Sequence, residues 1–159
     1  MKNKNTLYLC QGAVIAAMYV ILTYISALVG LSSGAIQVRI SEALCILPVF
    51  MPAAIPGLTI GCLIANILTG STALDIIFGT LATLIGALGT YALRKHKYIS
   101  LLPPIVANMI IVPLVLKAAL HLQDAYLYMV LTVGIGEVIS AGILGYILRL
   151  ALEKRNLRL

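Results

Sequence analysis

One carboxylate, Glu137, lies between two long uncharged stretches, 125–136 and 138–148. Gly134 and Gly136 have no side chains, so the backbone beside Glu137 is accessible. Gly134, Glu137 and Ala141 share one face of a helix. If this helix spans a bilayer, a central carboxylate costs roughly 2.5–3.5 kcal/mol even on the lenient insertion scale. The position therefore predicts a ligand-binding role. The structural alternative is a protonated or hydrogen-bonded Glu137, with Asn108 as a candidate partner.

A second polar group lies before and at the start of an apolar segment. Arg39 and Glu42 are three residues apart, and Asp75 opens another segment on the same predicted side. Together with Glu137 they carry a net charge of −2 if all are ionised. An outward-facing pocket with this balance favours a ligand that is cationic or rich in hydrogen-bond donors, and it disfavours anions. The alternative is an interfacial ion-pair cluster that fixes the loop.

Other polar residues lie at the same predicted depth. Phe78 is one helical turn beyond Asp75 and could stack on a flat ring, although ordinary packing is the alternative for a single Phe. The candidate ligand-binding residues are Gln37, Arg39, Glu42, Asn66, Asp75, Phe78, Asn108 and Glu137.

Catalytic and metal chemistry find no support in the sequence. Ser and Thr residues lack a His-containing partner set, and no HExxH or P-loop pattern occurs. His96 and His121 are expected to be solvated loop residues. Cys10, Cys45 and Cys62 lack CxxC spacing and are expected to act as small apolar residues. We therefore expect no catalytic residue, no metal site and no enzymatic activity.

Composition identifies the surroundings of these residues. Of the 159 residues, 62% are hydrophobic and 10% are charged, against about 25% charged in soluble domains. Too few polar residues remain to cover a water-soluble surface, which predicts an integral membrane protein. A spanning helix needs roughly 20 residues, so the length leaves room for a single transmembrane domain over 1–159 and none for a soluble ATPase domain.

Prolines and glycines divide the apolar stretches into an all-α bundle of six transmembrane helices. Pro48, Pro52 and Pro56 make one long helix over 43–74 unfavourable. Pro103 and Pro104 fall in the first turn of a later helix, where proline is tolerated. The predicted helices cover about 6–28, 40–51, 54–69, 74–93, 100–119 and 126–150.

The basic residues predict the orientation of this bundle. Nine lie on the side of the termini and only two on the opposite side, which predicts cytoplasmic N- and C-termini. We interpret the basic flanks as topology signals and contacts to anionic lipid, not as a nucleic-acid site. The nine are Lys2, Lys4, Arg94, Lys95, Lys97, Arg149, Lys154, Arg155 and Arg158, and the two are Arg39 and Lys117.

The first predicted helix carries strips of small residues. Ala13-x-x-x-Ala17 and Gly12-x-x-x-Ala16 would let another helix approach closely. Gly57-x-x-x-Gly61 is similar. Such strips serve either internal packing or a partner protein.

The chain resembles a known family at these motifs. The strings IQVRISEAL (36–44) and PAAIPG (52–57), the segment 75–83 and Gly134-x-Gly136-Glu137 are similar to the QueT family, and six short spans with AxxxA in the first resemble the substrate-binding S component of an energy-coupling factor (ECF) transporter. The resemblance covers nearly the whole chain.

The resemblance implies uptake of a queuosine precursor, 7-cyano- or 7-aminomethyl-7-deazaguanine, across a bacterial plasma membrane. It implies a separate transmembrane scaffold, contacted through Ala13 and Ala17, and two ATPase subunits that use the ATP, so that this chain needs no cofactor. Glu137 would accept from the guanine-like edge, with Asn108 or Gln37 on the ring carbonyl. A cationic aminomethyl group could meet Glu42 or Asp75.

Other functions also fit the residues. A proton- or cation-coupled carrier that works as an oligomer would use Glu137 as its titrating group, and its uptake would collapse with uncouplers and not depend on ATP. An S component for a different vitamin-like ligand, or a structural membrane subunit without a ligand, are further alternatives.

The charge bias makes a testable prediction about the loop at 30–37. A cysteine introduced at Ser33 should react from outside the cell with a membrane-impermeant thiol reagent, because the positive-inside rule places this loop outside. Labelling that appears only after permeabilisation would contradict the six-span assignment.

Overall fold

The computed structural model describes residues 4–31, 36–120 and 126–155, and within these ranges it contains helices and turns but no strand. Lys2, Ser33, His121 and Arg158, which entered the predictions above, lie outside the described residues. The elements are α1 (Lys4–Leu28), η1 (Ile40–Val49), α2 (Ala54–Leu68), α3 (Ala73–Ala92), η2 (Ile99–Leu101), α4 (Leu102–Leu120), α5 (Tyr126–Glu137), η3 (Val138–Leu144) and α6 (Gly145–Lys154).

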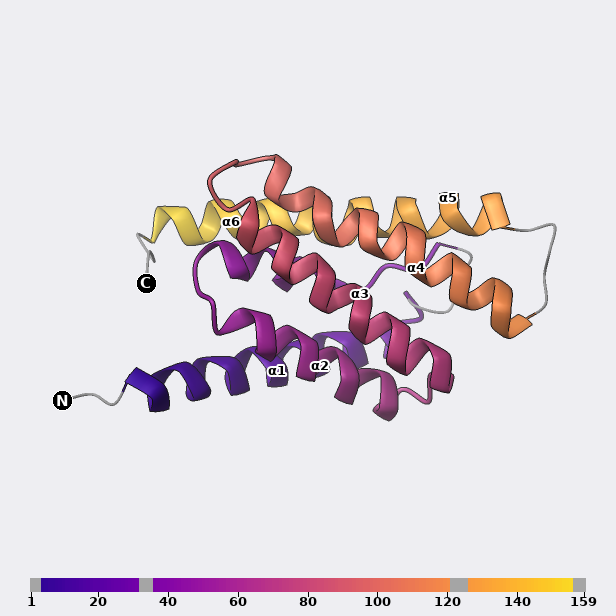
Figure 1. Cartoon of the computed structure of the whole chain (residues 1–159), viewed down its shortest axis with the longest axis horizontal. Coiled ribbons are helices and arrows are strands. Elements are labelled where there is room, and N and C mark those ends of the chain that lie inside the picture. The colour runs from indigo at the N-terminus through magenta and orange to yellow at the C-terminus, as the bar shows by residue number, and fades with distance from the viewer. Residues whose placement is uncertain (1–3, 32–35, 121–125, 156–159) are drawn as a thin grey trace.

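The helices form a bundle in which chain neighbours pack side by side. The long elements contact one another in the order α1, α2, α3, α4 and α5 (Figure 1). The start of α1, the end of α6 and the connection from α3 to α4 lie at the same end of the bundle (Figure 1). The segments that carry most of the basic residues therefore share one end, as predicted. Which side of a membrane this end faces stays a prediction.

The all-helical class is confirmed, and three stretches are long and apolar enough to cross a membrane: Lys4–Leu28, Ala73–Ala92 and Tyr126–Lys154. The apolar helices Ile40–Val49, Ala54–Leu68 and Ile99–Val115 are shorter. With 15 residues, α2 spans about 22 Å, which is less than the roughly 30 Å of a hydrocarbon core. Six complete spans therefore stay a prediction.

Two predicted helices differ in type from the observed ones. The helix expected at 40–51 is a 3₁₀ helix of 10 residues with Pro48 near its end. The helix expected at 126–150 continues to Lys154 and changes to a π-helix over Val138–Leu144. Hydrophobic patterning gives the position of a helix but is too coarse to distinguish these windings from an α-helix.

The element η1 lies at the centre of the bundle. It packs against α1, α3, α6 and η3, and every residue from Ser41 to Pro48 is buried. A 3₁₀ helix rarely extends beyond three or four residues, so contacts on all sides are what support its length. Outward-facing positions remain apolar and exposed, as Val14, Leu131 and Ile147 illustrate, which fits a lipid-facing surface.

Small residues bring α1 and α2 into close contact. A Cβ atom on Gly57 would lie 2.7 Å from the Gly12 carbonyl oxygen, and one on Gly61 would lie 3.0 Å from the Ala16 Cα. The strip Gly12/Ala16 thus packs internally against Gly57/Gly61. In contrast, Ala13 and Ala17 are exposed.

The segment before η1 crosses α5 at a glycine. A Cβ atom on Gly136 would collide with the carbonyl oxygen of Gln37, so a side chain there cannot coexist with the observed backbone. Beyond this crossing, the Arg39 backbone N–H donates to Ser140 Oγ at 3.1 Å. These two contacts fix the chain that leads into η1.

This crossing predicts the effect of a single methyl group. Gly136→Ala should lower the free energy of unfolding by about 1–3 kcal/mol, the usual cost of overpacking, because the Gln37 backbone must move. Thermal unfolding of the purified protein in detergent measures the change. Gly142→Ala is the matched control, since its Cβ would meet the Ile105 side chain at 3.6 Å. Equal stability of the two variants would contradict the close crossing.

Candidate functional site

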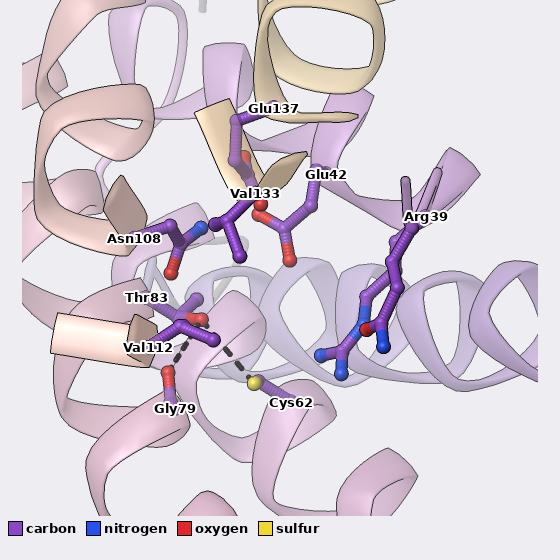
Figure 2. A pocket seen from close by; sticks show the side chains of 10 residues that line it. Arg39, Glu42, Cys62, Gly79, Thr83, Asn108, Val112, Val133 and Glu137 are labelled. Carbon is purple, nitrogen blue, oxygen red and sulfur yellow. Dashed lines mark hydrogen bonds between the residues drawn. The ribbon is translucent and has the colours of Figure 1, made fainter. Parts of the chain in front are cut away.

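Five of the predicted polar residues line one small cavity inside the bundle. Gln37 and Arg39 reach it from the segment before η1 and Glu42 from η1 itself. Asn108 reaches it from α4 and Glu137 from the end of α5 (Figure 2). The cavity has a volume of about 40 Å³. Its wall is completed by Cys62, Gly79, Thr83, Val112 and Val133.

Glu137 brings an unsatisfied polar atom to this cavity. Its Oε2 atom is buried and has no hydrogen-bond partner. The Asn108 side chain points toward Glu137 (Figure 2). The residue expected to partner a structural Glu137 therefore lies nearby, but one carboxyl oxygen has no hydrogen-bond partner. A buried polar atom without a partner costs roughly 1–3 kcal/mol, which a ligand donor would recover.

Glu42 is satisfied by the protein itself. This residue is 2% exposed, and its carboxylate accepts a very short hydrogen bond from the Tyr19 hydroxyl at Oε1. The Cys45 thiol donates to Oε2 at 3.1 Å. Glu42 thus faces the cavity as a carboxylate that is already oriented from two sides.

The buried face of α1 supports the segment that carries the site. Thr23 Oγ1 donates to Ser41 Oγ at 2.8 Å, and the backbone N–H of Ile40 donates to Ser26 Oγ at 3.0 Å. Tyr19, Thr23 and Ser26 form a polar stripe on the buried face of α1. Each anchors the beginning of η1, so α1 determines where Arg39 and Glu42 lie.

A larger outer chamber of about 250 Å³ adjoins the small cavity and shares Gln37, Arg39 and Val112 with it. The remaining lining residues are Thr23, Ala27, Thr69, Ser71 and Asp75. The polar residues of the site thus form an inner cavity and an outer chamber, with Arg39 and Gln37 between them.

Asp75 and Asn66 lie outside the inner cavity. Asp75 is in the first turn of α3, where its backbone N–H donates to Thr72 Oγ1 and its carboxylate accepts from the same hydroxyl at 2.8 Å. This is an N-terminal cap, which satisfies the free end of the helix. The buried Asn66 amide nitrogen lies 3.5 Å from the Asp75 carbonyl oxygen and joins α2 to α3.

The ion-pair cluster considered above does not form. No salt bridge joins Arg39, Glu42 or Asp75 in the part of the chain that the structure describes. The salt bridges in that part join Glu153 to Lys97 and to Arg149, at the end of the bundle where the basic residues gather.

Phe78 faces away from the polar cavity. It is 41% exposed and lines an apolar groove between α3 and α4 together with Leu74, Ile111, Leu114 and Val115. In this geometry, Phe78 is not positioned to stack on a ring bound beside Glu137.

Sequence reasoning missed several residues of the site. Tyr19, Thr23 and Ser26 recur at helical spacing, a signal that was available in an apolar segment. Thr83 donates to Cys62 Sγ at 3.2 Å in the cavity wall. Neither of these two is charged, and no local pattern sets them apart from other residues of α2 and α3. Within the described ranges, no three His, Cys, Asp or Glu side chains are grouped to hold a metal ion.

Comparison with known proteins places this arrangement in a family. The model of the QueT transporter family matches residues 9–154. The queuosine precursor transporter QueT of Lactococcus lactis subsp. cremoris (strain MG1363) is 42% identical over 85 residues, which cover 54% of this chain and 50% of that protein. No solved structure matches the chain. The family match extends over almost all of the described helices, and the chain therefore belongs to the QueT transporter family.

Proposed function

We propose that this chain binds a 7-deazaguanine precursor of queuosine from outside a bacterial plasma membrane, as the S component of an ECF importer. Membership of the QueT transporter family supports the transport role, and the name of the Lactococcus relative supports the ligand class. The observation that carries the proposal is the open, buried Oε2 of Glu137. A separate scaffold protein with two ATPase subunits would drive transport by ATP hydrolysis, and this chain would catalyse no reaction.

The ligand chemistry matches the inner cavity. A guanine-like edge presents a ring N–H and an exocyclic amine, which a carboxylate can accept as a pair. Glu137 has an acceptor free for this edge, and Asn108 lies beside it to meet the ring carbonyl. Gln37, whose exposed side chain lies at the border with the outer chamber, is a second candidate for the carbonyl.

The partner surface would be the exposed strip of α1. Ala13 and Ala17 are exposed, whereas Gly12 and Ala16 face α2. Two small residues four apart on a free helical face permit close approach of another helix. This arrangement supports a scaffold contact at Ala13 and Ala17.

A cation-coupled carrier is the second candidate, because the same open carboxyl oxygen could hold a transported proton or cation. Uptake distinguishes the two functions. Import that persists without ATP and collapses with an uncoupler would favour the carrier, whereas ATP-dependent import would favour the ECF assembly. An S component for another vitamin-like ligand would show ATP-dependent import but no 7-deazaguanine binding.

Bulky residues at Ala13 and Ala17 of α1 should reduce transport without reducing ligand binding. Ala13→Leu combined with Ala17→Trp should leave the affinity of the purified chain for 7-deazaguanine nearly unchanged, because these side chains lie outside the cavity. Uptake in cells should fall sharply, because the close approach of the scaffold is blocked. Calorimetry and an uptake assay measure the two effects.

The matched control is Val14→Leu combined with Met18→Trp, which places the same two side chains at the neighbouring exposed positions of α1. This control should transport normally. Loss of ligand binding in the Ala13/Ala17 variant, or equal loss of uptake in the control, would contradict a specific docking surface.

Glu137→Gln should weaken binding of 7-deazaguanine at least about tenfold, because the substitution replaces a charged acceptor by a neutral amide that also brings a donor. An analogue without the exocyclic amine should bind the original protein more weakly and lose less on the substitution. Calorimetric titration of both ligands measures this difference.

Three roles of Glu137 give different results in that titration. A structural role would lower thermal stability and weaken both ligands equally. A proton-coupling role would preserve binding and remove its pH dependence. Equal losses for the two ligands would falsify the assignment of Glu137 to the guanine-like edge.

A further inference from the structure

Two ionisable groups, one acidic and one basic, face the inner cavity with atoms that the protein leaves unpaired. One is Oε2 of Glu137, which is buried without a partner. The other is the guanidinium of half-buried Arg39, for which no hydrogen bond or ion pair is formed with the described residues. The two groups interact electrostatically but are not joined in a salt bridge. The space between an acceptor and a donor is therefore available to a ligand.

The other carboxylates of the site are already engaged. Glu42 accepts from Tyr19 and Cys45, and Asp75 accepts from Thr72 as part of the α3 cap. A count of formal charges suggests a pocket for a cation, but the atoms without partners suggest a ligand that both donates and accepts hydrogen bonds. They present one acceptor at the inner end and a fork of N–H donors at the border of the outer chamber.

The volumes of the inner cavity and the outer chamber indicate that a bound ligand extends across the border between them. The inner cavity of about 40 Å³ has space for water but not for a bicyclic ring. Only together with the outer chamber of about 250 Å³ does the space approach the roughly 300 Å³ at which ligand sites begin. Arg39 and Gln37 line both volumes. A bound base must therefore pass beside Arg39.

We propose that Arg39 determines the specificity of the site by reading a hydrogen-bond acceptor on the ligand's C7 substituent. This inference rests on the proposed function. The donor edge of the base lies at Glu137 and Asn108, and the C7 substituent lies at Arg39 and extends into the outer chamber. A nitrile is neutral and accepts a hydrogen bond from the guanidinium. An aminomethyl group is a cation without an acceptor, and the positive Arg39 repels it.

The substrate class that follows is a neutral 7-deazaguanine with an acceptor at C7, and the 7-cyano base is its simplest member. Asp75 also lines the outer chamber and keeps its negative charge while it accepts from Thr72, so the preference requires the C7 substituent to lie nearer to Arg39 than to Asp75. The arrangement therefore assigns the engaged carboxylates to folding, and it assigns Glu137 and Arg39 to the ligand.

The test is calorimetric titration of the full-length chain in detergent with 7-deazaguanine and its 7-cyano and 7-aminomethyl derivatives. The original protein should bind the 7-cyano base at least about tenfold more tightly than the 7-aminomethyl base, the difference expected for one hydrogen bond to a charged group. Arg39→Gln should reduce this ratio at least about tenfold and leave the affinity for the unsubstituted base within about threefold.

Two further variants sharpen the test. Asp75→Asn removes a charge from the outer chamber and should leave the ratio unchanged. Arg39→Lys retains the charge and should keep most of the preference. Arg39→Gln should fold, because the Arg39 contact with η3 is made by its backbone N–H to Ser140, and an unchanged thermal midpoint checks this. If Arg39→Gln does not fold, loss of the preference in Arg39→Lys would overturn the charge argument.

The outcomes separate this inference from the proposed function. Binding of the bases with the same ratio in the original protein and in Arg39→Gln would overturn the role of Arg39 alone. Selective loss of the 7-aminomethyl base in Asp75→Asn would place the substituent at Asp75 and would also overturn it. Failure of all three bases to bind would reject the proposed function, and the role of Arg39 with it.

Discussion

The burial of η1 is the constraint on which the rest of the structure depends. Non-α backbone is tolerated at membrane depth only where protein covers it, because lipid offers no hydrogen bonds. The 3₁₀ helix Ile40–Val49 meets this condition through packing against α1, α3, α6 and η3. Its polar side chains, Ser41 and Glu42, receive their partners from α1. The bundle is therefore built around a short central element that carries polar groups.

The site is a consequence of this arrangement. Because α1 and η3 hold the backbone at Arg39 and Ile40, the Arg39 guanidinium lies at the border of the two chambers and forms no salt bridge with the described carboxylates. Glu137 lies at the point where α5 passes into the π-helix, a type of irregularity that is frequent at functional sites. Polar groups without partners in a poorly solvated interior are costly.

The sequence was informative where a residue type has a strong local effect. Pro48 and Pro52 indicated that the second apolar stretch is divided, and Pro103 and Pro104 marked the start of α4. Charged residues in apolar stretches identified Arg39, Glu42 and Glu137, since burial without a function is expensive. Side-chain direction could not be predicted in the same way. Phe78 and Asp75 are three residues apart, yet one faces an apolar groove and the other the outer chamber.

The two sides of α1 show why composition alone could not assign its small residues. Gly12 and Ala16 contact α2, whereas Ala13 and Ala17, one position further along, are exposed. A rotation of 100° per residue puts neighbouring strips on different faces, and only the packing of α2 decides which strip is used. The stripe Tyr19, Thr23 and Ser26 lies on the buried face and holds η1. A single helix therefore supports the site on one face and leaves a surface free for close approach on another.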